Sequence, residues 1–81
     1  MLDFSDSFES SNIKRIVIGE ISEDVVQIMF KSSKMLYNYQ IKEENWVNSL
    51  QTVIDSKESV GKFVNSSIRE EKLELISKFL P

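Results

Sequence analysis

The sequence predicts an α+β domain in which a three-stranded antiparallel β-meander is followed by two or three α-helices packed on one face. Two patterns predict this fold. Three short segments between residues 13 and 41 carry apolar residues at alternate positions or β-branched runs, which are typical of strands. From residue 46 onward, apolar residues recur at helical spacing. A chain of 81 residues is expected to form one domain with a small core.

The three expected strands are joined by short polar links. Residues 13–18 are rich in β-branched side chains and end at Gly19. Residues 26–30 and 35–41 alternate between two sets of side chains, as strands with one buried face do. Short links between consecutive strands favour antiparallel pairing, and therefore a meander.

Tyr37 and Tyr39 lie on the same face of the third expected strand, because side chains alternate along a strand. In one interpretation both pack in the core beneath the helices. In the other they form an open stacking platform for bases, beside the positive charges of Lys31 and Lys34. The opposite face suits a core poorly, since it offers Leu36, Asn38 and Gln40. The pattern therefore favours buried tyrosines.

Three apolar stripes follow the strands. The first predicts an amphipathic helix with Glu43 and Glu44 in its first turn, where the helix dipole favours negative charge. Its apolar residues are Trp46, Val47, Leu50, Val53 and Ile54. The second stripe consists of Val60, Phe63, Val64 and Ile68, and the third of Leu73, Ile76, Phe79 and Leu80. The third is out of phase with the second, so we expect a break near residues 69–72.

Composition narrows the function classes. The chain has no cysteine and no histidine, which removes disulfides, zinc sites and the commonest catalytic base. We therefore expect no enzyme, no catalytic or metal-binding residues and no cofactor. No apolar run approaches the ~20 residues of a membrane span, and the start is acidic where a signal peptide is basic. A cytoplasmic protein without a membrane partner is the expectation.

Charge is unevenly distributed along the chain. The net charge of −3 argues against a general affinity for nucleic acid. Residues 1–12 are rich in Ser, Asp and Glu, and predict a mobile acidic arm before a single domain at residues 13–81. Leu2, Phe4 and Phe8 in that arm are expected to dock on the protein's own core, or alternatively on a neighbouring subunit or partner. Residues 25–41, by contrast, hold two lysines and no acid.

A polar strip is expected on the second helix. Lys62, Asn65 and Arg69 are spaced i, i+3 and i+7, opposite the apolar stripe, and Lys72 follows one turn later. The strip is either a solvated helix face or an anion-binding surface, since Arg, Lys and Asn all donate hydrogen bonds to phosphate. Gly61 in the same segment permits close approach of another backbone.

Four short segments resemble the KTSC domain family. They are "SSNI" at residues 10–13, "VQIMF" at 26–30, "YNY" at 37–39 and "SVGKFVNSSIR" at 59–69. The family's domain is found at the C-terminus of some lysyl-tRNA synthetases, and it also occurs alone in bacterial and phage proteins. The resemblance covers about residues 10–70 and implies an RNA-associated role.

These observations predict a non-enzymatic module that binds RNA or a small phosphate-bearing ligand such as a nucleotide. A phage-encoded protein that sequesters a nucleotide would fit, and we expect a homo-oligomer with the ligand at a subunit interface. The ligand-binding residues would be Arg69, Asn65, Lys62, Lys31, Lys34, Tyr37 and Tyr39. The alternative is a protein–protein interaction module, an inhibitor or adaptor, that binds a host protein through the N-terminal arm or the C-terminal helix. A third interpretation, a carboxylate enzyme, would use Glu70 and Glu71.

Overall fold

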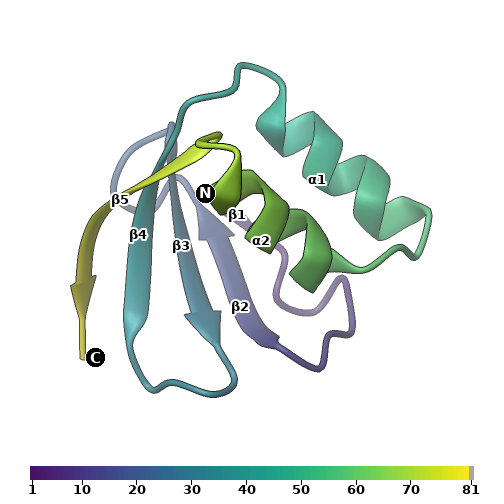
Figure 1. Cartoon of the computed structure of the whole chain (residues 1–81), viewed down its shortest axis with the longest axis horizontal. Coiled ribbons are helices and arrows are strands. Elements are labelled where there is room, and N and C mark those ends of the chain that lie inside the picture. The colour runs from purple at the N-terminus through teal and green to yellow at the C-terminus, as the bar shows by residue number, and fades with distance from the viewer. Residues whose placement is uncertain (81) are drawn as a thin grey trace.

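A computed structural model describes residues 1–80 and shows a five-stranded antiparallel sheet with two helices on one face (Figure 1). The strands lie in chain order: β1 (Leu2–Asp3), β2 (Ile13–Ile18), β3 (Val25–Phe30), β4 (Leu36–Ile41) and β5 (Leu73–Phe79). Helices α1 (Trp46–Asp55) and α2 (Val60–Arg69) connect β4 to β5. The α+β class and the central three-stranded meander are confirmed, but the sheet has two further strands.

One added strand lies in the segment predicted to be an arm. Leu2 pairs with Ile18 and Asp3 with Val17, so β1 extends the sheet beyond β2. Phe4 is buried in the core and Phe8 packs against it. The two phenylalanines therefore dock on the protein's own core, whereas Leu2 is 51% exposed and does not. The mobility of the segment stays a prediction.

The other added strand, β5, occupies the segment where the sequence allowed a third helix, so of the two or three helices expected, two are found. Helix α2 ends where Glu71 adopts a left-handed conformation (φ 61°). The backbone N–H of Glu71 donates to the carbonyl of Ile68 (3.2 Å), and that of Lys72 donates to the carbonyl of Ser67 (2.8 Å). This pair of bonds is the Schellman motif, which stops a helix and reverses the chain.

A β-bulge explains why β5 looked helical in the sequence. Asn38 pairs with Ser77 and Tyr39 with Leu75, so Ile76 is an extra residue in β5. An extra residue interrupts the alternation of side chains. Leu73, the bulge residue Ile76 and Phe79 then fall three positions apart, which imitates the spacing of a helix.

The start of α1 also differs from the prediction. The helix begins at Trp46, and no acidic residue lies in its first turn. Glu43 and Glu44 precede it because the backbone N–H of Lys42 still pairs with the carbonyl of Lys72 (2.8 Å), which prolongs the β4–β5 ladder past Ile41. Glu43 is thereby placed beside Lys72 instead of inside the helix.

The core lies between the helices and the sheet. Its fully buried side chains include Ile16, Val26 and Ile28 from the sheet and Trp46, Leu50 and Val64 from the helices. On the opposite face of the sheet, Gln27 Nε2 donates to Asn38 Oδ1 and Asn38 Nδ2 donates to Ser77 Oγ, both at 3.0 Å. This polar ladder crosses β3, β4 and β5. Neither helix in residues 1–80 is long and apolar enough to span a membrane.

Candidate anion-binding surface

Basic side chains gather at one end of the sheet. Antiparallel pairing brings the start of β2, the end of β3, the start of β4 and the end of β5 to the same edge, which is the lower edge in Figure 1. We call this edge the basic end, and its five exposed cations are Lys14, Arg15, Lys31, Lys34 and Lys78. The sequence prediction found only Lys31 and Lys34.

The strands and turn that form the basic end contain no acidic residue, but two carboxylates lie beside it: Glu9 near Lys14 and Lys31, and Asp3 near Arg15. Residues 10–18, 25–41 and 75–80, which form it, contain no Asp or Glu. Among residues 1–80, all ion pairs involve Lys72, so no carboxylate pairs with a cation of the basic end. The opposite end of the sheet is acidic: Glu20, Glu23, Asp24, Glu43, Glu44, Glu70, Glu71 and Glu74 lie in or beside its connections. The charge of the molecule is therefore polarised along its strands.

Two shallow depressions border the basic end on either side of the loop at residues 9–12. The first, of about 480 Å³, is lined by Lys14 and Lys31, with Glu9 as its one carboxylate. The second, of about 450 Å³, is lined by Lys62 and Asn65 of α2 and also by Lys57 and the carboxylates of Glu9 and Glu58. Both depressions share loop residues, so two of the predicted lysines, Lys31 and Lys62, lie on opposite sides of one loop.

Ser10 holds that loop against helix α2. Its Oγ accepts hydrogen bonds from the backbone N–H groups of Asn12 and Ile13, both at 3.1 Å. A Cβ atom placed on Gly61 would lie 3.4 Å from the same Oγ, so the loop and the first turn of α2 are in close contact. The "SSNI" and "SVGKFVN" segments, far apart in the sequence, therefore pack together.

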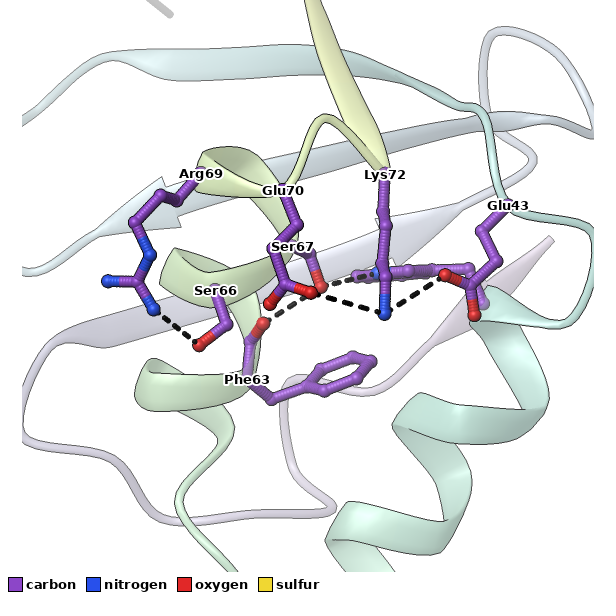
Figure 2. A network of polar contacts seen from close by, with 8 residues as sticks. Glu43, Phe63, Ser66, Ser67, Arg69, Glu70 and Lys72 are labelled. Atoms are coloured by element: carbon purple, nitrogen blue, oxygen red, sulfur yellow. Dashed lines mark hydrogen bonds and ion pairs between the residues drawn. The ribbon is translucent and has the colours of Figure 1, made fainter.

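The polar strip on α2 is present but shorter than predicted. Lys62, Asn65 and Arg69 are exposed, and Arg69 Nη2 donates to Ser66 Oγ at 3.3 Å (Figure 2). Lys72 points away from Arg69 (Figure 2), and it lines a separate depression of about 320 Å³ together with Lys62 and Ser66.

Carboxylates also neutralise Lys72. Its Nζ lies 3.1 Å from Glu43 and 3.8 Å from Glu70. The hydrogen bond with Glu43, its negative charge and that of Glu70 raise the pKa of Lys72. Lys72 therefore holds the β5 start against the segment before α1, and it offers little to an external anion.

The tyrosine pair lies on the helix-covered face. Tyr39 is 6% exposed and belongs to the core, whereas Tyr37 is half-buried. Their rings stack with centroids 6.4 Å apart, and Phe30 meets Tyr37 edge-on at 5.6 Å. Burial raises the pKa of the Tyr39 phenol, and the neighbouring Tyr37 adds to the effect. A base cannot stack on the buried ring of Tyr39 in this conformation, which leaves Tyr37 as the accessible member.

Three cations escaped sequence reasoning because they are distant along the chain. Lys14 and Arg15 follow an acidic segment, and Lys78 was assigned to a helix. Only the strand register shows that they share one edge with Lys31 and Lys34. Lys34 lies exposed in the β3–β4 turn, away from the α2 strip.

Comparisons of the chain with protein-family models, curated proteins and solved structures found no match. The similarity to the KTSC domain family therefore stays a prediction. Within residues 1–80, Asp and Glu side chains form no group of three or more that could hold a metal ion.

Proposed function

We propose that the protein is a non-enzymatic binding module that recognises RNA or a small phosphate-bearing ligand, such as a nucleotide, at the basic end. The observation that carries the proposal is the concentration of five exposed cations, with only Glu9 and Asp3 beside them, in a chain of net charge −3. Such a concentration attracts phosphate groups and releases their counterions.

The surroundings of the basic end supply further hydrogen-bond donors. The loop at residues 9–12 offers two serine hydroxyls, and Asn65 offers an amide beside Lys62. The depressions on either side of the loop, of about 480 and 450 Å³, fall in the size range of small-ligand sites. A phosphate held by Lys14 and Lys31 would leave the rest of a nucleotide near the loop.

A neighbouring depression is unsuited to phosphate. It measures about 520 Å³ and is lined by Asp6, Glu9 and Glu58, with Lys57 as its one cation. Three carboxylates would repel a phosphate group. The charge pattern therefore directs an anionic ligand to the basic end and not to the surface below α1.

Fluorescence anisotropy with two labelled probes, a short single-stranded RNA and a nucleoside triphosphate, tests this proposal. Lys31→Gln is expected to weaken binding of the probe. It should also reduce the slope of log affinity against log salt concentration by about 1, the value for one lost phosphate contact. Lys42→Gln is the matched control, since it removes the same charge from an exposed site at the acidic end. If both variants bind alike, or if neither probe binds at low salt, the proposal is wrong.

One observation favours the alternative, a protein–protein interaction module. Four apolar side chains of the last segment are exposed: Leu75, Ile76, Phe79 and Leu80. The N-terminal segment is less suited to bind a partner, because Phe4 is buried and β1 belongs to the sheet. Deletion of residues 1–9 would consequently damage the fold, and substitutions in β5 are the cleaner test of this function.

A further inference from the structure

Three apolar side chains lie side by side on the face of the sheet that the helices leave uncovered. Met29 pairs with Leu36 and Leu36 pairs with Phe79, so the three share one face of β3, β4 and β5. We call them the apolar row. Arg15 pairs with Met29 and ends the row on β2. Phe79 is 42% exposed and Met29 is half-buried, and in residues 1–80 no member of the row belongs to the core under the helices.

An exposed apolar side chain with acidic neighbours lies at the opposite end of the same strands. Ile21 is 59% exposed and stands between Glu20 and Glu23 in the connection from β2 to β3. We call residues 20–24 the acidic loop; it lies at the end of the sheet opposite the basic end (Figure 1). Both glutamates are exposed, and the ion pairs within residues 1–80 all involve Lys72. The fold therefore uses neither Ile21 nor these two charges.

The acidic loop is held in one shape by Asp24. Ser22 Oγ donates to Asp24 Oδ1 at 2.6 Å, and Gln40 Nε2 donates to Asp24 Oδ2 at 2.5 Å. The backbone N–H of Val25 donates to the carbonyl of Ser22 at 3.2 Å and closes the turn. The hydrogen bonds from Ser22 and Gln40 lower the pKa of Asp24, so its carboxylate stays charged at neutral pH. Because the loop is ordered before it binds, it loses little conformational entropy on docking.

We propose that the acidic loop of one copy docks on the apolar row of a second copy, so that copies of the chain associate head to tail. Ile21 would contact Met29 and Phe79 at the centre. The glutamates of the loop would lie near Arg15 and near Lys34 of the β3–β4 turn. The two surfaces match because each has exposed apolar atoms beside charge, and the charges are opposite in sign.

The position of the two surfaces decides the kind of assembly. Strand β2 runs from Arg15 to the acidic loop, so the loop and the row of one copy lie at opposite ends of the strands. Each copy therefore offers one loop and one row, and the contact is heterologous. Dimers, trimers and longer species should follow one another as concentration rises. A single loop on a shallow row makes a small interface, so we expect association at about 0.1–1 mM.

Two variants that each remove one surface provide the test, measured by sedimentation velocity and native mass spectrometry. Ile21→Ser removes the apolar contact of the loop, and Phe79→Ser removes that of the row. Each should weaken self-association at least about tenfold, which is the contribution of one large buried apolar side chain. The Phe79→Ser copy keeps its loop and the Ile21→Ser copy keeps its row. An equimolar mixture of the two should therefore form heterodimers and nothing longer.

Leu75→Ser is the matched control for the row. Leu75 is 49% exposed on the same strand, but it pairs with Tyr39 and so lies on the other face, and its loss should leave association unchanged. Ile21 and Phe79 are exposed, so circular dichroism should show both variants folded. Wild type that stays monomeric at about 1 mM would overturn the proposal. So would an Ile21→Ser variant that associates like wild type, a Leu75→Ser variant as weak as Phe79→Ser, or a mixture without heterodimers.

Head-to-tail association does not depend on the proposed ligand. Neither Ile21 nor Phe79 lines the depressions on either side of the loop at residues 9–12. Both variants should therefore bind the RNA and nucleotide probes as wild type does. Loss of probe binding in Lys31→Gln tests the ligand site alone, so failure of one proposal is distinguishable from failure of the other.

Discussion

Trp46 Nε1 donates a hydrogen bond of 2.8 Å to Ser67 Oγ, and the two side chains are 0% and 2% exposed. Ser67 Oγ in turn donates to the carbonyl of Phe63 at 2.8 Å. The ring of Phe63 stacks on the indole with centroids 5.4 Å apart. The first residue of α1 is thus bound to the last turn of α2 by a buried polar contact, which fixes how the two helices pack.

Replacement of Ser67 by alanine is expected to destabilise the fold by about 1–3 kcal/mol, because the buried indole N–H would lose its acceptor. The control is Ser66→Ala, since Ser66 is only half-buried and bonds to the exposed Arg69. Urea unfolding, followed by the fluorescence of Trp46, measures both variants. If both variants lose the same free energy of unfolding, the buried hydrogen bond between Trp46 and Ser67 does not stabilise the fold more than the exposed one.

The left-handed residue after α2 offers a stabilising change. Glu71 has a φ of 61° and is exposed. Because a residue with a Cβ atom pays about 1–2 kcal/mol in this conformation and glycine does not, Glu71→Gly is expected to raise the free energy of unfolding by about 1 kcal/mol. Glu71→Ala, which removes the carboxylate but keeps the Cβ atom, should give no such gain. A loss of stability in the glycine variant would contradict the prediction.

The turn at Glu71 is also the point after which the sequence pattern no longer predicts the correct secondary structure. The strands from residue 25 to residue 41 and both helices have uninterrupted periodicity, so their existence was predictable. β2 was predictable from its β-branched residues, although a register shift between Ile13 and Arg15 interrupts its alternation. The last strand has none, because the Ile76 bulge interrupts it. Glycine or proline usually signals a chain reversal before a strand, and here Glu71 occupies that position. β1, with two residues, is too short to show a pattern.

The candidate surface was partly predictable for a similar reason. Lys31 and Lys34 lie in one continuous stretch without acids, which is visible in the sequence. The contribution of Lys14 and Lys78 depends on strand register, which only the folded chain provides. Lys72 was misleading, because its partner Glu43 precedes α1 and the ion pair forms only when β4 and β5 meet.

The contact between Gly61 and Ser10 predicts opposite effects on stability for two substitutions of Gly61. A methyl group at Gly61 would meet Ser10 Oγ at 3.4 Å and Asn12 Cβ at 3.6 Å, which are ordinary contact distances. Gly61→Ala should therefore be neutral or stabilising by up to about 1 kcal/mol, since alanine favours the helix. Gly61→Leu should destabilise by about 1–3 kcal/mol, because the larger side chain displaces the loop. Thermal unfolding measures both, and a strongly destabilised alanine variant would contradict the assigned contact.

Tyr39 predicts how stability changes at alkaline pH. Burial first, and then the neighbouring Tyr37, raise the pKa of the Tyr39 phenol above its usual value of 10.0. As the pH rises past that value, the phenol ionises in the unfolded chain while the folded protein retains its proton. The free energy of unfolding must then fall until the folded pKa is reached.

Tyr39→Phe removes the contribution of this phenol to the pH dependence of stability. The free energy of unfolding of the variant relative to wild type should therefore increase between about pH 8 and about pH 11. The raised pKa of Lys72 also lowers the free energy of unfolding at alkaline pH. Because wild type and the Tyr39→Phe variant both contain Lys72, this effect cancels when the two are compared. Urea unfolding at a series of pH values measures the difference, and a constant difference across that range would show that Tyr39 is not buried as described.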